Sequence, residues 1–234
     1  MIDIHCHLLY GVDDGAKDYE ESVAMLEFAK TQGVDEIILT PHYRNGMFSY
    51  DKSKIERHYI KLKEYAQESG IKLHIGCEYH VDSDMMDNIL NGEVHTLADT
   101  DYVLAEYSHM SDYKMMRDTL QELIMSGYTP IIAHAERYDC IQRLPDLAWN
   151  LRELGAKIQI NADSLLGIDG HQLKKVCKKL LKQRQVDYVA SDSHHMKERI
   201  NHMRDAYIYI GKKYSKELAQ QLVEDNPRQI VASK

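Results

Sequence analysis

The chain opens with "MIDIHCHLLYGVDDG" (residues 1–15), and this stretch decides both the fold and the site. Apolar and polar residues alternate over residues 2–7, which predicts a strand. Side chains two residues apart on a strand share a face, so Asp3, His5 and His7 point to one side. The apolar residues beside them, with Cys6, point to the other. We therefore expect one face of this strand to carry chemistry and the other to pack.

The length and composition predict a single globular domain over residues 1–234. Hydrophobic residues make up 44% of the 234, and α/β barrels of this length commonly form one domain. No apolar run approaches the roughly 20 residues of a membrane helix. The chain opens directly on the proposed strand, so we expect no signal peptide and a cytoplasmic protein. The net charge of −8 argues against binding to nucleic acid or to an anionic membrane.

The four cysteines predict a reducing compartment and no cysteine chemistry. They form no C-x-x-C pair, which is atypical of a disulfide framework. Enzymes that use a cysteine nucleophile in a C-x5-R loop place an arginine six residues after it. The residues at that distance from the four cysteines here are Val12, Ser83, Asp146 and Gln183.

Short apolar runs alternate with segments of helical period along the whole chain. This pattern is typical of repeated βα units with a parallel sheet. We expect seven strands, at residues 2–7, 36–40, 72–77, 102–107, 129–133, 157–161 and 187–191. The main helices are expected at residues 18–33, 52–69, 113–125, 145–154 and 172–183, with a last helical stretch over 197–223. Seven such units predict an α/β barrel with its active site at the carboxyl ends of the strands, the rim.

Imidazole and carboxylate groups follow nearly every predicted strand. The candidate metal ligands are His5, His7, Asp14, His42, Glu78, Glu106, His134, Asp192 and His194. The sixth strand ends instead on Asn161. Imidazoles and carboxylates without thiolates suit Mn, Fe or Zn, and nine ligands exceed the needs of one ion. The sequence therefore predicts two or three ions, which are typical of phosphate-ester hydrolysis, although a metal cluster alone also fits amide hydrolysis.

Two arginines favour a phosphate substrate. Arg137 follows His134 by three residues, and Arg199 follows Asp192 by seven. A guanidinium group matches phosphate oxygens with two parallel hydrogen bonds. Near the rim, His80 and His195 are further candidates for a supporting or proton-donating role. Asp3 and Asp13 are candidates for supporting carboxylates.

Together these motifs resemble the PHP (polymerase and histidinol phosphatase) superfamily. The resemblance rests on D-x-H-x-H at the start, the following "DDG", a His after the second strand, a Glu after the third and a late D-x-H. Within that superfamily, "TPHYRNGMF", "AHAERYD", "ASDSHH" and "DNPRQIV" are similar to the CpsB/CapC group of bacterial capsule-type protein-tyrosine phosphatases. The likeness covers residues 1 to about 231.

The resemblance implies a distorted seven-stranded barrel with a centre of three divalent ions, usually Mn²⁺. It assigns one ion to His5, His7, Glu78 and Asp192, a second to Glu78, Glu106 and His134, and a third to Asp14, His42 and His194. Arg137 and Arg199 fall where the family binds phosphate. A hydroxide held between two ions would then attack phosphotyrosine, and the substrate would be a tyrosine autokinase that controls export of a cell-surface polysaccharide.

Three other functions stay open on the sequence alone. One is hydrolysis of a small alkyl phosphate such as histidinol phosphate. Another is phosphodiesterase or nuclease action, against which the acidic charge counts. The third is a binding module that keeps the barrel only as a scaffold, which the full ligand set disfavours.

Overall fold

The computed structural model describes residues 1–232 and is an α/β fold built on parallel strands. Nine strands are present in these residues, and every pair of neighbouring strands is parallel. They are β1 (Ile2–Cys6), β2 (Glu36–Leu39), β3 (His42–Tyr43), β4 (Lys72–Ile75), β5 (Glu78–His80), β6 (Tyr102–Glu106), β7 (Thr129–Ile132), β8 (Lys157–Asn161) and β9 (Tyr188–Ala190).

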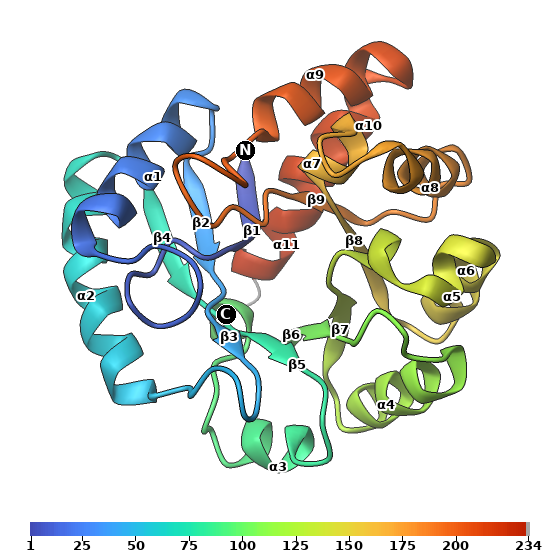
Figure 1. Ribbon diagram of the computed structural model, residues 1–234, viewed down its shortest axis with the longest axis horizontal. Helices are drawn as coiled ribbons and strands as arrows, with labels where there is room; N and C mark the ends of the chain where they lie inside the picture. Colours follow the sequence, from blue (N-terminus) through green and yellow to red (C-terminus); the bar gives the residue numbers. More distant parts are fainter. Residues whose placement is uncertain (233–234) are drawn as a thin grey trace.

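The strands form two sheets that curl around a common centre (Figure 1). One sheet has the order β1-β2-β4 and the other the order β3-β5-β6-β7-β8-β9. A parallel bridge between Cys6 and Ser193 brings the end of β1 beside the segment that follows β9. The parallel, curled α/β arrangement agrees with the sequence, but the described residues form nine strands where seven were expected, because β3 and β5 lie just beyond the expected second and third strands.

The expected strands at 36–40 and 72–77 are each followed by a further short strand, β3 and β5, after a break with a local cause. Pro41 separates β2 from β3, and proline has no N–H with which to continue a ladder. Gly76 lies between β4 and β5, where a Cβ atom would come within 2.7 Å of Leu97 Cδ2. The short helical turn η1 (Leu97–Asp99) therefore packs against the backbone at this point. Before the break at Gly76, β4 pairs with β2, and after it β5 pairs with β6.

Helices surround the strands on the outside (Figure 1). The helices of residues 1–232 are α1 (Tyr19–Thr31), α2 (Lys52–Glu68), α3 (Met85–Leu90), α4 (Tyr113–Met125), α5 (Asp139–Arg143), α6 (Asp146–Glu153), α7 (Ala162–Leu166), α8 (His171–Lys182), α9 (Met203–Lys213), α10 (Lys216–Gln220) and α11 (Asn226–Ala232). A turn η2 (Ala135–Arg137) follows β7, and a π-helical segment η3 (Gln221–Asp225) joins α10 to α11. No helix in this part of the chain is long and apolar enough to cross a membrane.

The helix ends follow the capping residues in the sequence. The Asp18 side chain accepts a hydrogen bond from the Glu21 N–H at 2.9 Å, as its position before α1 predicts. The last helical stretch differs from the expectation of one helix over 197–223. Helix begins only at Met203, because residues 194–202 form a loop in which the His194 N–H bonds to the Arg199 carbonyl. Ser215 then caps a separate helix, α10.

The core also corrects the expected alternation along β1. Cys6 packs in the large cluster between strands and helices, whereas Ile2 and Ile4 belong to a smaller cluster with Leu104. The pairing of β1 with β2 shifts register between Asp3 and Cys6. Because such an irregularity breaks the two-residue period, the apolar residues of β1 do not share one environment.

Candidate metal centre

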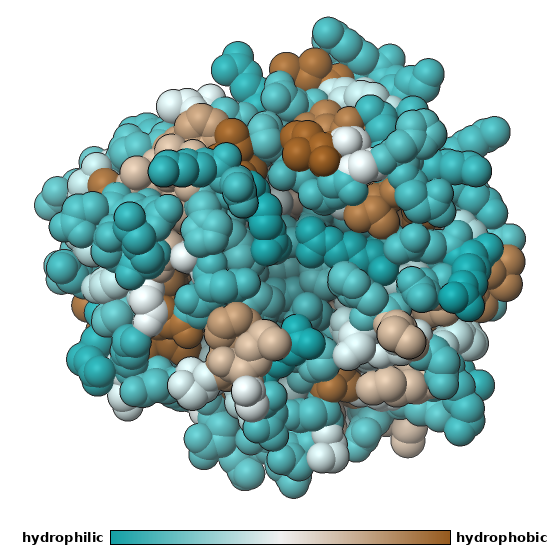
Figure 2. Space-filling view, viewed as in Figure 1, coloured by the Kyte–Doolittle hydropathy of each residue, from teal (hydrophilic) through white to brown (hydrophobic). Residues whose placement is uncertain are grey.

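The side chains at the strand ends gather in one depression. The face turned to the viewer is hollowed near its middle and is hydrophilic there (Figure 2). The segment between β1 and α1 loops across this face (Figure 1). Three sets of His, Asp and Glu residues offer ligand atoms that lie within 4.8 Å of one another. All nine ligand candidates from the sequence lie in or against these sets.

The first set, the inner group, consists of His5, His7, Glu78 and Asp192, and all four are buried. The Nε2 atoms of His5 and His7 lie 3.3 Å apart, although both come from the first strand segment. Glu78 Oε2 is 3.1 Å from His5 Nε2 and 3.2 Å from His7 Nε2. Asp192 Oδ1 approaches the same two nitrogens at 3.5 and 3.6 Å. Two imidazoles and two carboxylates therefore converge without a lysine or arginine among them.

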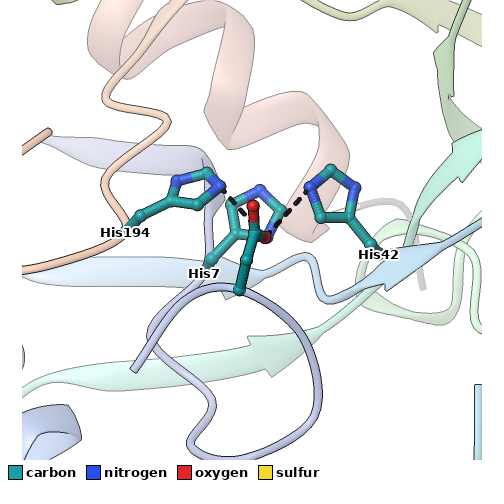
Figure 3. A group of neighbouring side chains, drawn as sticks. His7, His42 and His194 are labelled. Atoms are coloured by element: carbon teal, nitrogen blue, oxygen red, sulfur yellow. Dashed lines mark ion pairs between the residues drawn. The ribbon is translucent and has the colours of Figure 1, made fainter. Parts of the chain in front are cut away.

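The second set, the outer group, consists of His7, Asp14, His42 and His194 (Figure 3). Asp14 Oδ1 lies 3.5 Å from His42 Nε2 and 3.6 Å from His194 Nε2. The Asp14 side chain is 50% exposed, whereas those of His42 and His194 are 11% and 1% exposed. The outer group therefore shares His7 with the inner group and opens to solvent through Asp14.

The third set joins His42, Glu78 and Glu106. His42 Nδ1 is 3.1 Å from Glu78 Oε2 and 3.9 Å from Glu106 Oε2. His134 lies against the same carboxylates, with its Nε2 atom 2.9 Å from Glu78 Oε1 and 3.8 Å from Glu106 Oε1. Glu78 thus contacts residues of all three sets, the arrangement expected of a bridging carboxylate.

Unpaired buried atoms support cation binding at this site. Glu78 Oε2, Glu106 Oε2, His42 Nδ1 and His194 Nε2 are buried and make no hydrogen bond in the described part of the chain. Buried polar atoms without partners are costly unless something else satisfies them. These four are lone-pair donors of the kinds that Mn, Fe and Zn accept. The residues present therefore fit a divalent metal centre.

The electrostatics of the carboxylates point the same way. Burial and then the Glu78 charge raise the pKa of Glu106 to about 8. Burial opposes ionisation of Glu78 too, yet the neighbouring His5 and His42 hold its pKa well below the usual range. One carboxylate thus disfavours ionisation of the other. A divalent cation between them would remove that repulsion.

Three residues of the site have a strained backbone. Six non-glycine residues have positive φ within residues 1–232, and three of them are His134, Asp192 and Arg199, at 32°, 53° and 54°. Such conformations cost free energy and persist where the surrounding structure enforces them, often at functional sites. The contacts of the site therefore hold these three residues in a left-handed conformation that L-amino acids otherwise avoid.

The two predicted phosphate-binding arginines both contact the inner group. Asp192 Oδ2 lies 3.1 Å from Arg137 Nη1 and 2.7 Å from Arg199 Nη2. Arg137 Nη2 also lies 3.7 Å from Asp169 Oδ2, and its side chain is 21% exposed against 37% for Arg199. The structure therefore brings both guanidinium groups to one oxygen of a ligand candidate.

Asp13 lies directly behind the outer group, in the supporting position expected of it. Its Oδ2 atom is 2.8 Å from His7 Nδ1 and accepts a hydrogen bond from the His42 N–H at 3.0 Å. Burial opposes a charge on His7, but the Asp13 carboxylate raises the pKa of that imidazole to about 10. Asp3 accepts hydrogen bonds from the Ser191 N–H at 3.0 Å and from Asn201 Nδ2 at 3.0 Å. It thus ties β1 to the segment after β9.

The other two histidines named near the rim lie outside the three sets. His80 Nε2 is 3.3 Å from Ser108 Oγ, and burial and then the Arg44 charge lower its pKa. His195 is 43% exposed, with its Nδ1 atom 3.8 Å from Glu21 Oε1.

Sequence reasoning missed Gln159 altogether and gave Asn161 no role. Both side chains are buried, and both bond to ligand candidates. The available signal was the strand "KIQIN" itself, where two amides two residues apart interrupt an apolar strand. A polar side chain in the middle of a buried strand needs partners, and here those partners belong to the site.

None of the cysteines belongs to the three sets of ligand candidates in the described residues. Cys6, Cys77 and Cys177 are buried, and burial raises the pKa of each thiol well above its usual range. A thiolate nucleophile requires the opposite shift.

Comparison with known proteins places this site in a family. Residues 1–232 match the family model "Capsular polysaccharide synthesis, CpsB/CapC". The chain is 37% identical to the tyrosine-protein phosphatase CpsB of Streptococcus pneumoniae over 99% of its length and 98% of the relative's. It is 34% identical to the tyrosine-protein phosphatase YwqE of Bacillus subtilis, over 96% of this chain and 89% of that one.

A crystal structure from a study of YwqE and CpsB superposes on the whole chain. The TM-score is 0.93 at 31% sequence identity, covering 100% of this chain and 95% of the other. That study describes the two proteins as unique metal-dependent tyrosine phosphatases. Since a single family model spans all of the described residues and curated relatives match over nearly their full length, the chain belongs to the CpsB/CapC family.

Proposed function

We propose that this chain is a metal-dependent protein-tyrosine phosphatase. The observation that carries the proposal is the convergence of three linked sets of ligand atoms on Glu78, with two arginines on Asp192 beside them. Metal ligands next to guanidinium groups suit a phosphate ester better than an amide, because the arginines match phosphate oxygens. The tyrosine phosphatase names of the relatives support the choice of phosphotyrosine.

The centre would hold three divalent ions, most simply Mn²⁺, with Fe or Zn as the other metals that suit the ligands. We assign His5, His7, Glu78 and Asp192 to the first ion. The second would use Glu78, Glu106 and His134, and the third Asp14, His42 and His194. Residues 1–234 would act as one domain, a distorted seven-stranded barrel in which two strands are interrupted. Bound divalent ions supply a nucleophile at neutral pH and neutralise charge on the phosphoryl oxygens.

The chain's own residues would bind and orient the phosphate. Arg137 and Arg199 are 21% and 37% exposed and can exchange part of their contact with Asp192 for contact with phosphoryl oxygens. Their charge would also stabilise the negative charge that develops in the transition state. The leaving group is a tyrosine phenolate with a pKa near 10, so it needs less help from a proton donor than an alkoxide does.

The substrate would be a phosphotyrosine protein. The family model concerns capsular polysaccharide synthesis. On that basis we propose a bacterial tyrosine autokinase that regulates surface polysaccharide as the partner, and no nucleic acid.

The test is hydrolysis of a phosphotyrosyl peptide by the purified chain before and after metal removal. We expect a chelator to abolish turnover and Mn²⁺ to restore it best. Histidinol phosphate and a single-stranded DNA oligonucleotide serve as competing substrates in parallel. Full activity in a sample shown by mass spectrometry to be metal-free would contradict the proposal. Faster turnover of histidinol phosphate than of the peptide would instead assign a small-molecule phosphatase.

A further inference from the structure

In the six-stranded sheet, β8 is the strand that neither contains nor leads directly into a ligand candidate. It carries Gln159 and Asn161, which share one face of the strand and are 0% and 1% exposed. Each makes side-chain hydrogen bonds in the site. These two buried amides bond to ligand candidates but are not ligand candidates themselves, so the proposed ligand sets do not explain why they are there.

The contacts fix which way the Gln159 amide points. The backbone N–H of His134 can only donate, and it lies 2.8 Å from Gln159 Oε1, so the oxygen of this amide must face it. The same oxygen lies 3.1 Å from His5 Nδ1. Because an amide oxygen only accepts, His5 must carry its proton on Nδ1. Nε2 is then the ring nitrogen left to bind a cation, and it faces Glu78 and Asp192 in the inner group.

The orientation of Gln159 fixes that of Asn161, and Asn161 in turn fixes which oxygen of Asp192 it contacts. Because Gln159 Oε1 faces His134 and His5, the Gln159 NH₂ group points the other way and donates to Asn161 Oδ1 at 2.8 Å. Asn161 therefore presents its NH₂ group to Asp192, and the distance from Nδ2 to Asp192 Oδ2 is 2.6 Å. Asp192 Oδ2 is thus occupied, and Oδ1 is the atom that lies near His5 and His7.

We propose that Gln159 and Asn161 form an amide relay that sets the tautomer of His5 and the orientation of Asp192, and so positions two ligands of the inner group. The inference rests on the proposed metal centre and adds two positioning residues to it. Partners behind the ligands commonly tune metal affinity by about 10- to 100-fold. The relay would also keep Asp192 in place when Arg137 and Arg199 turn toward a phosphate.

The main test measures Mn²⁺ binding to the metal-free full chain by competition with a chelator. Gln159→Met keeps the volume and removes the amide, so we expect affinity at the tightest site to fall by about 10- to 100-fold. Asn161→Leu should lower affinity less, because the two arginines still contact Asp192 Oδ2. Gln185→Met is the matched control, since Gln185 is also buried, at 4% exposure, and its Oε1 atom makes no hydrogen bond in the described residues.

Wild-type Mn²⁺ affinity in folded Gln159→Met would overturn the relay. So would an equal loss in the Gln185→Met control, which would indicate a general effect of removing a buried amide. The binding measurement needs no phosphatase activity. A chain that binds Mn²⁺ as expected but does not hydrolyse phosphotyrosine would therefore contradict the proposed function and leave the relay standing.

A measurement on the wild-type chain covers the case in which the variants do not fold. Nitrogen-15 histidine spectra of the diamagnetic Zn²⁺-loaded protein report which ring nitrogen carries the proton. We expect the proton of His5 on Nδ1. A proton on Nε2, or none on Nδ1, would overturn the relay directly.

Discussion

The inner and outer groups differ in burial although they share His7. Every inner ligand candidate has a side chain no more than 2% exposed. In the outer group, Asp14 is half exposed. Buried carboxylates need strong compensation for lost hydration, whereas a solvent-facing one does not. We infer from this difference that the inner group retains its ion more firmly and that the outer group lies on the side where substrate enters.

The two groups are also supported differently. Gln159, Asn161 and both arginines back the inner group through His5 and Asp192. Asp13 backs the outer group, through His7 and the His42 backbone. Removal of an inner residue should therefore disturb more contacts than removal of an outer one.

The largest effect is expected for Asp192→Ala. This change removes an inner ligand and leaves the charges of Arg137 and Arg199 without the carboxylate that they contact. We expect phosphotyrosyl-peptide hydrolysis to fall to the level of the chelated wild type, with loss of at least one ion by elemental analysis. Circular dichroism checks that the fold persists. Wild-type turnover with full metal content would show that Asp192 is not a metal ligand.

The next largest effect is expected for Arg137→Ala and Arg199→Ala. Loss of one charged donor to a developing anion costs about 2.7–4 kcal/mol, or roughly two to three decades in kcat. Metal content should stay near the wild-type value, because Asn161 and the other arginine still contact Asp192 Oδ2 in each variant. Arg→Lys should recover activity only in part. If an alanine variant lost its activity only because it lost its metal, that arginine would act through the inner group alone and would not be a phosphate ligand.

A smaller effect is expected for Asp14→Ala, which breaks the outer group at its exposed member. The inner ions should remain, and kcat/KM should fall, but by less than in Asp192→Ala. Elemental analysis should show about one ion fewer per chain than in the wild type. Complete loss of all ions would show that the two groups bind metal as one unit. It would contradict the inference that the inner group retains its ion more firmly than the outer group. His42→Ala should have a larger effect, since His42 also contacts Glu78.

The smallest effect is expected from thiol alkylation. Cys140 is the half-buried cysteine, and it lies in α5 outside the three ligand sets. Iodoacetamide on the folded protein should modify Cys140 first and leave peptide hydrolysis within about twofold of the untreated rate, because no thiolate takes part. Mass spectrometry identifies the modified residue, and Cys140→Ser is the control. Inactivation of the wild type but not of Cys140→Ser would show that this helix influences the site.

The positions of the ligand candidates could be predicted because parallel strands bring their carboxyl ends together. His5, His42 and His134 are far apart in the chain, yet each lies at the end of a recognisable apolar strand. Helix ends were predictable where a capping side chain acts on its own helix, as Asp18 does at α1. Both signals are local, so the residues alone carry them.

Contacts between distant segments were not predictable in the same way. The interruption at Gly76 depends on where Leu97 packs, and the irregularity in β1 depends on its pairing with β2. Gln159 resembled an ordinary strand residue because its partner His5 lies 154 positions away.

The sequence by itself therefore determined the kinds of ligand, their places at strand ends and the α/β class. Periodicity assigns each side chain to a face, and short-range capping assigns each helix its end. Only the tertiary structure decided that Glu78 contacts three sets of ligand candidates, that two arginines meet at Asp192, and that β8 contacts ligand candidates without containing one. The physical reason is that periodicity fixes the direction of a side chain, whereas its partners depend on how the sheets curl and close.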